Sequence, residues 1–412
     1  MDIIHCVNDM PLPRVVGPSL RDRLRVMPAV VVTGARQTGK STLAESLTPG
    51  PRRYLSFDDL DVLDAARRDP EVLVGGSEPV TLDEVQREPS VLHHVKRAID
   101  RRRVPGRFLL TGSANLLLMR QVSESLAGRA SYLTLSPMTR REQQGRGACG
   151  IWGELVDADP EQWPEVVAAQ PDDALDWRDA AQRGGFPVPA LQLDTPANRA
   201  IWFDGYVRTY LERDLRDISA VASLSDFRRL MQAASLRLGA LVNQTDLGRD
   251  VALAQSTVHR YLNLLEASMV LVRLPAYAVN RTKRLIKAPK LYWADTGLAL
   301  HLAGTDPTGA HLENLVLADM LAWCATRTDH AAVCHWRTAA GQEVDFIIEA
   351  GDRVLPVEVK ASARPRLSQI APLRSFLADY AERSRAGLLL HSGTAVEWLA
   401  PNVLAAPWWR VL

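Results

Sequence analysis

A glycine-rich segment near the amino end places the strongest constraint on how this chain can fold. Gly34, Gly39, Lys40 and Ser41 complete the pattern G-x-x-x-x-G-K-[ST], directly after the apolar run AVVV that begins at Ala29. The apolar run predicts a buried strand, and the residues from Ser41 onward predict a helix. The glycines allow a tight loop whose N–H groups point at phosphate oxygens, and the helix directs its positive end at the same anion. The alternative is an ordinary glycine-containing turn between a strand and a helix.

The loop predicts a site for ATP and Mg²⁺. Lys40 would supply a positive charge for the β- and γ-phosphates, and the Ser41 hydroxyl would ligate the metal ion. The residues expected around the phosphates are Gly34, Ala35, Arg36, Gln37, Thr38, Gly39, Lys40, Ser41 and Thr42.

A second acidic element follows about 40 residues later, in PVTLDEVQ from Pro79 to Gln86. It predicts a strand that ends in Asp83 and Glu84, with Thr81 interrupting its apolar run. Asp83 would hold Mg²⁺, directly or through water, and Glu84 would polarise the attacking water. An apolar run that ends in Asp-Glu is common at strand ends. It indicates a nucleotide site here because it follows the phosphate loop at this distance.

Two further residues are candidates for the same site. Ser113 follows the predicted strand Arg107–Gly112 and is expected to sense the γ-phosphate, with Thr111 as the alternative. Arg129, in ESLAGR, is a candidate arginine finger that acts in a neighbouring subunit of a homo-oligomer. A surface salt bridge would explain a lone arginine equally well.

The composition indicates a multidomain soluble protein. A chain of 412 residues exceeds one ordinary core, and its hydrophobic content of 47% and charged content of 24% are typical of globular domains. The net charge of +1 gives no global signal for nucleic acid or membranes. No apolar run approaches the length of a membrane span, and the amino end does not match a signal peptide, so we expect a cytoplasmic protein without membrane contact. Residues 151–180 hold nine acidic side chains against one basic, which predicts a solvated connector rather than a binding site.

Residues 224–274 predict a winged helix-turn-helix. A short helix from Gln244 and a second helix, with apolar residues at Val258, Leu262, Leu265 and Met269, precede an extended segment. His259, Arg260 and Asn263 would face outward. The following hairpin, 281–290, is basic and is expected to contact DNA phosphates through Arg281, Lys283, Arg284, Lys287 and Lys290. The alternatives are a solvated wing and a module that packs on the nucleotide-binding domain.

The last segment carries a second constellation of charged residues. Glu313 lies on a predicted helix, Asp345 lies on one predicted strand, and Glu358 and Lys360 share a face of the next. A short turn at Gly351 would pair the two strands, so that Asp345 and Glu358 could hold a second divalent cation, Mg²⁺ or Mn²⁺, beside the lysine. This is the arrangement of PD-(D/E)XK nucleases. The alternative is charged residues on an exposed sheet face.

The segments described above and the segments FLLTGSANLLL, SLAGRA, LSPMTRRE and YLERDL occur together and in order along the chain. As a set they resemble the prokaryotic AAA-type ATPases that end in the domain of unknown function DUF4143. The resemblance implies an α/β protein with a P-loop AAA-like ATPase domain, a winged-helix middle domain and a C-terminal restriction-endonuclease-like α/β domain. We expect the ATPase domain over residues 1–145, an acidic connector and helical region over 146–222, the winged helix over 223–305 and the nuclease-like domain over 306–412.

Two functions are compatible with this organisation. In the first, ATP hydrolysis controls a metal-dependent nuclease that acts on DNA. In the second, a signalling or scaffold ATPase uses the nuclease-like domain to bind a partner or nucleic acid without cleaving it. ATP hydrolysis is expected in both, and cleavage only in the first.

Overall fold

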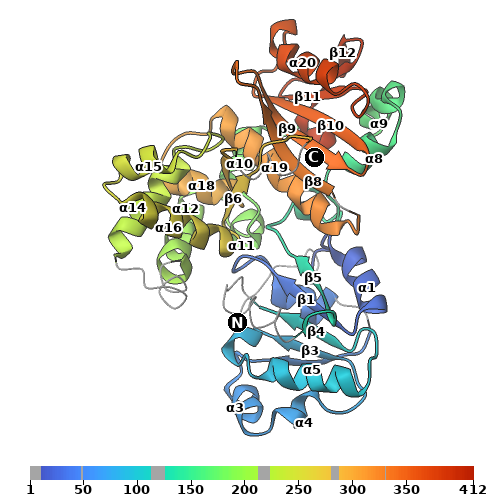
Figure 1. Cartoon of the computed structure of the whole chain (residues 1–412), viewed down its shortest axis with the longest axis vertical. Coiled ribbons are helices and arrows are strands. Elements are labelled where there is room, and N and C mark those ends of the chain that lie inside the picture. Colours follow the sequence, from blue (N-terminus) through green and yellow to red (C-terminus); the bar gives the residue numbers. More distant parts are fainter. Residues whose placement is uncertain (1–10, 48–49, 113–125, 212–222, 280–286, 330) are drawn as a thin grey trace.

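The computed structural model describes residues 11–47, 50–112, 126–211, 223–279, 287–329 and 331–412. Two sheets lie at opposite ends of the molecule, and a group of helices lies to one side between them (Figure 1). The first sheet comes from the amino-terminal third of the chain, and the second from the carboxy-terminal quarter.

The amino-terminal sheet has five parallel strands in the order β2-β3-β4-β1-β5. Side chains of β1 alternate between two cores, because Ala29 and Val31 face one hydrophobic cluster while Val30 and Val32 face another. Helices therefore cover both faces, as the continuous apolar run of a parallel strand requires. The strands are β1 (Ala29–Thr33), β2 (Arg53–Ser56), β3 (Val80–Asp83), β4 (Phe108–Thr111) and β5 (Ala130–Thr134).

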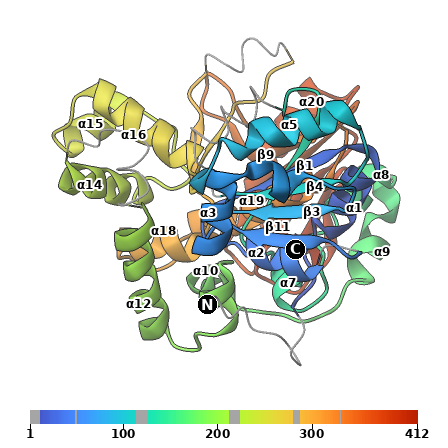
Figure 2. The same cartoon turned by 90° about the horizontal axis from the view of Figure 1, so that it is seen from below.

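Helix α1 (Gly17–Val26) and the helix after the glycine-rich loop cover one face, and α3 to α5 cover the other (Figure 2). The predicted helix after the loop begins as α2 (Lys40–Thr42) and continues as the π-helical turn η1 (Leu43–Leu47). The remaining elements are α3 (Leu60–Arg68), α4 (Pro70–Val74), the 3₁₀ turn η2 (Val85–Arg87) and α5 (Val91–Arg101).

Thr81, the polar interruption in the apolar run of β3, is fully buried. Its hydroxyl oxygen accepts a hydrogen bond of 3.1 Å from Nε of Arg52. The same guanidinium donates to the carbonyl oxygens of Val80 and Gly106. A hydroxyl paired in this way avoids the cost of an unsatisfied buried polar group, so the interruption is compatible with a central strand.

Residues 151–180 are not a solvated spacer, so that prediction was wrong. Trp152, Trp163 and Trp177 are 0%, 4% and 2% exposed and belong to the largest hydrophobic core. The acidic side chains lie around these anchors, because only one side of each short helix is buried. The elements between β5 and the middle region, which include this stretch, are α7 (Arg140–Gln143), α8 (Trp152–Asp157), η3 (Pro160–Gln162), α9 (Trp163–Ala168), α10 (Trp177–Arg183), α11 (Pro187–Leu191), α12 (Pro196–Tyr206) and η4 (Val207–Leu211).

The middle region consists of helices followed by a pair of antiparallel strands, and its winged-helix fold stays a prediction. Helices α14 (Leu224–Ser235), α15 (Gln244–Asp250) and α16 (Gln255–Ala267) precede two antiparallel strands, β6 (Leu271–Leu274) and β7 (Lys290–Trp293). Ala254 is the N-cap of α16. Helix α18 (Thr296–Ala303) follows. Binding of DNA by this region stays a prediction.

The carboxy-terminal sheet has six strands in the order β12-β13-β11-β10-β9-β8. Its central hairpin is the predicted one, in which β9 and β10 pair antiparallel with Ala350 opposite Arg353. Helices α19 and α20 cover opposite faces of the sheet. The elements are α19 (Gly309–Thr326), β8 (Ala331–Arg337), β9 (Glu343–Ala350), β10 (Arg353–Lys360), η5 (Leu367–Ile370), α20 (Ala371–Asp379), β11 (Gly387–His391), β12 (Glu397–Ala400), β13 (Val403–Pro407) and α21 (Trp408–Val411).

Candidate functional site

The glycine-rich loop joins the carboxyl end of β1 to α2. Gly39 has φ of 92° and ψ of 28°, a left-handed conformation that favours glycine. Lys40 is buried at the first position of α2, and its Nζ donates to the carbonyl oxygens of Gly34 at 3.2 Å and Ala35 at 2.8 Å. The loop therefore holds a buried ammonium group against its own backbone, at the positive end of a helix.

The structure brings Ser41 and Asp83 together, as the two motifs predicted. Oγ of Ser41 donates to Oδ1 of Asp83 at 3.2 Å. The other carboxylate oxygen accepts from the hydroxyl of Tyr54 at 2.9 Å and from Oγ of Ser56 at 3.3 Å, and Thr111 also donates to the Asp83 carboxylate. A carboxylate and a hydroxyl side by side are oxygen ligands suited to Mg²⁺, so these residues fit the metal ion expected with ATP.

Tyr54 and Thr111 were not predicted as donors to this carboxylate. Tyr54 is the second residue of β2 and Thr111 is the last residue of β4, and these two strands are the neighbours of β3. Burial, followed by the charge of Asp83, raises the pKa of Tyr54, which keeps its hydroxyl protonated as a donor. The contacts of Tyr54 and Thr111 with Asp83 depend on the strand order, which the sequence analysis did not predict. For Thr111 the sequence did give a signal, because it is a polar residue at the end of a strand.

Glu84 lies directly after β3 in a left-handed conformation, with φ of 57° and ψ of 42°. A residue other than glycine in this region carries strain, which is common at functional sites. Burial raises the pKa of Glu84, the neighbouring Asp83 adds to this, and Lys40 opposes it. A carboxyl group with a raised pKa beside the phosphate loop is a suitable general base.

Arg14 is a residue of this site that the sequence analysis missed. Its Nη1 donates to the carbonyl oxygen of Thr38 in the loop at 2.7 Å, and its Nη2 donates to that of Ser136 at 2.7 Å. Its Nε lies 2.9 Å from Oε1 of Glu142, which is fully buried. Arg14 lies in an amino-terminal segment without periodicity or motif, so nothing in the sequence marked it.

The remaining predicted residues have different outcomes. Ser113 lies outside the described residues. Arg129 forms an ion pair with Asp100 of α5, with Nε 2.6 Å from Oδ1 and Nη2 3.0 Å from Oδ2. Its carbonyl oxygen accepts from the backbone N–H of Ala29, at the amino end of β1. Arg129 therefore lies at the opposite edge of the sheet from the loop, and its action in a neighbouring subunit stays a prediction.

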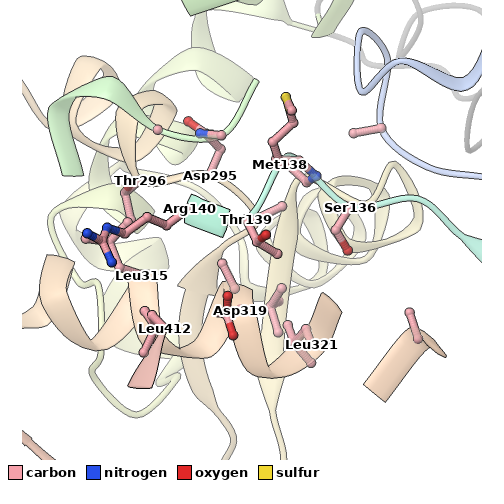
Figure 3. A pocket seen from close by; sticks show the side chains of 18 of the residues that line it. Ser136, Met138, Thr139, Arg140, Asp295, Thr296, Leu315, Asp319, Leu321 and Leu412 are labelled. Atoms are coloured by element: carbon pink, nitrogen blue, oxygen red, sulfur yellow. The ribbon is translucent and has the colours of Figure 1, made fainter. Parts of the chain in front are cut away.

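A cavity of about 530 Å³ lies where the three regions meet (Figure 3). Ala35 of the loop lines it together with residues 134–140, from the end of β5 to the start of α7, with Asp295 and Thr296 at the start of α18, and with Leu315 and Asp319 of α19. The carbonyl oxygen of Ala35 accepts a hydrogen bond from Lys40. The phosphate loop therefore borders a space shared with the carboxy-terminal region. On another side, the hydroxyl of Tyr206 donates to the carbonyl oxygen of Arg36 at 3.4 Å.

The second constellation assembles on the β9–β10 hairpin, but with more partners than predicted. The backbone N–H of Val359 donates to Oδ2 of Asp345 at 3.0 Å, and the N–H of Asp345 lies 3.4 Å from Oε2 of Glu358. Nζ of Lys360 pairs with Oε1 of Glu358. The Tyr292 hydroxyl donates to Glu313 at 3.0 Å. Burial, with the charge of Asp345 next, raises the pKa of both glutamates.

Lys290 completes this group and corrects the prediction of a basic surface patch. Its side chain is 2% exposed, with Nζ paired to Glu343 and 3.4 Å from Oδ1 of Asp345. It therefore cannot present its charge to DNA. Lys287 is exposed, whereas Arg281, Lys283 and Arg284 lie outside the described residues.

As arranged, these carboxylates do not fit a divalent cation. Asp83 accepts from neutral hydroxyl groups, whereas Asp345 and Glu358 each pair with an ammonium group, that of Lys290 or Lys360. In the described part of the chain no group of three or more His, Cys, Asp or Glu side chains could hold a metal ion. Within the same ranges, none of the helices combines the length and apolar character that a membrane span requires.

Three family models match the chain. An AAA domain matches residues 27–144, a domain of unknown function (DUF8612) matches 174–309, and a domain of unknown function (DUF4143) matches 308–411. An uncharacterized protein of Mycobacterium tuberculosis is 32% identical over 371 residues, which cover 87% of the chain and 76% of the relative. The chain belongs to the family of this protein. It is an AAA protein with a C-terminal DUF4143 domain.

More distant proteins extend the comparison. An uncharacterized protein of Haemophilus influenzae is 22% identical over 357 residues, covering 80% of the AAA–DUF4143 chain and 81% of the relative. A solved structure from Thermotoga maritima, titled as a DNA polymerase III gamma subunit-related protein, covers 61% of the chain and 97% of its own at 10% identity. Its TM-score of 0.24 is too low to support an argument.

Proposed function

We propose that this AAA protein binds ATP with Mg²⁺ and hydrolyses it at the loop between β1 and α2. The observation that carries the proposal is the hydrogen bond between Ser41 and Asp83, because it joins the two motifs into one site beside Lys40 and Glu84. A buried ammonium and a helix amino end stabilise phosphate charge, and the Ser41–Asp83 pair would hold the metal ion. Bound Mg²⁺ would neutralise charge on the phosphate oxygens.

The residues of this chain then have separate roles in hydrolysis. The loop N–H groups and Lys40 bind and orient the phosphates. Glu84 accepts the proton of the attacking water, and its raised pKa places its proton affinity nearer to neutral pH than that of an ordinary glutamate. Arg14 fixes the loop by holding the carbonyl oxygen of Thr38. Ser113 and Arg129 are the proposed γ-phosphate sensor and the finger supplied to a neighbouring subunit.

Release of inorganic phosphate from ATP by the full chain tests this function. Lys40→Ala is expected to abolish turnover, because it removes the positive charge from the loop. Lys287→Ala removes an exposed lysine elsewhere and serves as the matched control. A Lys40→Ala protein that hydrolyses ATP at the wild-type rate would refute the assignment.

For the part of the chain that follows the ATPase domain, we propose binding without cleavage, the second of the two functions considered from the sequence. The pairing of Asp345 and Glu358 with two lysines supports this choice, since a nuclease of the predicted type needs these carboxylates for a metal ion. The proposed partner is DNA, contacted by the middle region through the exposed His259 and Arg260 of α16 and through Lys287.

Fluorescence anisotropy of labelled duplex DNA across a salt series tests the partner. Arg260→Ala should weaken binding at low salt and make its salt dependence shallower, because a phosphate contact is lost. Arg364→Ala, which removes an exposed arginine from the carboxy-terminal domain, should leave binding unchanged. Equal affinities for the wild type and Arg260→Ala at every salt concentration would contradict DNA contact through α16. Degradation of the DNA with Mg²⁺ by the wild type would instead favour the nuclease.

A further inference from the structure

The carboxylate group of the C-terminal domain receives a cation from outside that domain. Lys290 is the first residue of β7, which pairs with β6 in the middle region. Its ammonium group is buried between Glu343 and Asp345 of β9. Tyr292, two residues further along β7 and on the same face of the strand, donates to Glu313 of α19. One strand of the middle region thus reaches two of the predicted acidic residues.

Every carboxylate oxygen of Asp345 and Glu358 faces a hydrogen-bond or ion-pair donor. These donors differ in the part of the chain from which they come. Two are the backbone N–H groups of Asp345 and Val359, which belong to the β9–β10 hairpin itself. The third is Lys360, which lies on the same strand as Glu358. Lys290 is the one donor among the four that reaches these oxygens from another region of the chain.

The charges of the group are also nearly balanced without a metal ion. Glu313, Glu343, Asp345 and Glu358 contribute four acidic groups, and Lys290, Lys360 and Arg337 contribute three basic ones, with Arg337 3.4 Å from Glu343. A divalent cation needs oxygen ligands at about 2.0–2.6 Å on several sides. The Lys290 ammonium lies 3.4 Å from Oδ1 of Asp345, where it takes the place of such an ion and repels it.

We propose that Lys290 is the built-in cation of this carboxylate group, and that docking of β7 and binding of a divalent cation there exclude each other. The proposal rests on the C-terminal function argued above, in that it explains why the carboxylates do not act on DNA in this arrangement.

Binding of Mn²⁺ to the nucleotide-free full chain, followed by electron paramagnetic resonance of the free ion, tests the proposal. The wild type and Asp345→Asn should bind equal amounts of Mn²⁺, because Asp345 holds no metal ion while Lys290 is in place. Lys290→Gln should gain about one Mn²⁺ per chain with at least tenfold higher affinity, and Lys290→Gln with Asp345→Asn should lose it. Arg364→Gln, which removes an exposed positive charge from the same domain, should behave as the wild type.

Two results would overturn the proposal. One is a wild type that loses an equivalent of bound Mn²⁺ on Asp345→Asn, since metal and Lys290 would then coexist. The other is a folded Lys290→Gln that gains no Mn²⁺. If Lys290→Gln does not fold, Lys290→Met replaces it, and the comparison of wild type with Asp345→Asn still decides. The Mn²⁺ result is independent of phosphate release and of DNA binding, so failure here is distinguishable from failure of the proposed function.

Discussion

Asp319 of α19 joins the region after the AAA domain to the C-terminal domain at a measurable energetic cost. Its Oδ1 accepts from the N–H of Gly150 at 2.7 Å and from Nε1 of Trp152 at 2.6 Å. Its Oδ2 has no hydrogen-bond partner among the described residues. Burial raises the pKa of Asp319 from 3.8 to about 6. At 1.36 kcal/mol per pKa unit, this difference corresponds to about 3 kcal/mol.

The effect of Asp319 on folding stability depends on pH, because its carboxyl group releases its proton at a lower pH in the unfolded chain than in the folded protein. Below pH 3.8 the carboxyl group is protonated in both states. As the pH rises, the unfolded chain ionises first and the folded chain holds its proton to about pH 6, so folding stability falls with rising pH across this window. Above it, the folded protein carries the full penalty of about 3 kcal/mol, of which about 1.5 kcal/mol develops between pH 5 and pH 8.

Asp319→Asn removes this titration while keeping an oxygen for Gly150 and Trp152. Urea unfolding followed by circular dichroism and by tryptophan fluorescence, at pH 5 and pH 8, gives the free energy of unfolding of both proteins. From pH 5 to pH 8, the free energy of unfolding of Asp319→Asn should rise by about 1.5 kcal/mol relative to that of the wild type. A constant difference in stability caused by the amide group itself would not alter this change. Asp306→Asn, at an exposed site, should show no such change. A gap between Asp319→Asn and wild type that is equal at both pH values would refute the reasoning.

Three further substitutions test the site and the fold. Glu84→Gln should retain ATP binding but lower the turnover number by about 10²–10⁴-fold in a phosphate-release assay, because the general base is lost; turnover within twofold of wild type would exclude this role. Arg14→Met should lower the free energy of unfolding by about 3–5 kcal/mol, because it leaves the buried Glu142 without its cation, and a loss below 1 kcal/mol in urea titrations would contradict this. Gly393→Ala should lower the melting temperature, since its Cβ would lie 1.9 Å from a carbonyl oxygen, whereas Gly205→Ala, which meets nothing within 4 Å, should not.

The nucleotide site could be predicted because its signals are local. The motif around Lys40 and the pair Asp83–Glu84 each follow a strand, and parallel strands bring their carboxyl ends to one edge. The structure places Ser41 against Asp83 accordingly. Arg14 could not be found in this way, because its partner Glu142 is 128 residues away and Arg14 itself belongs to no motif.

The acidic stretch and Lys290 show two different failures of sequence reasoning. In residues 151–180, net charge was weighed above the three tryptophans, which were a sufficient signal for a buried face. For Lys290, five basic residues within ten indicated an exposed patch, but its partners Glu343 and Asp345 lie more than 50 residues later. Ion pairs between distant segments depend on the tertiary arrangement, and no local pattern encodes them.

The position of Arg129 limits the symmetry of any assembly that would use it as a finger. The phosphate loop follows the carboxyl end of β1, whereas Arg129 pairs with its amino end, so donor and acceptor surfaces lie on opposite edges of one sheet. An isologous twofold dimer brings identical patches together, whereas the finger must meet a different patch. Subunits that complete each other's sites through Arg129 must therefore associate head to tail, and the rotation between neighbours then decides between a closed ring and an open filament.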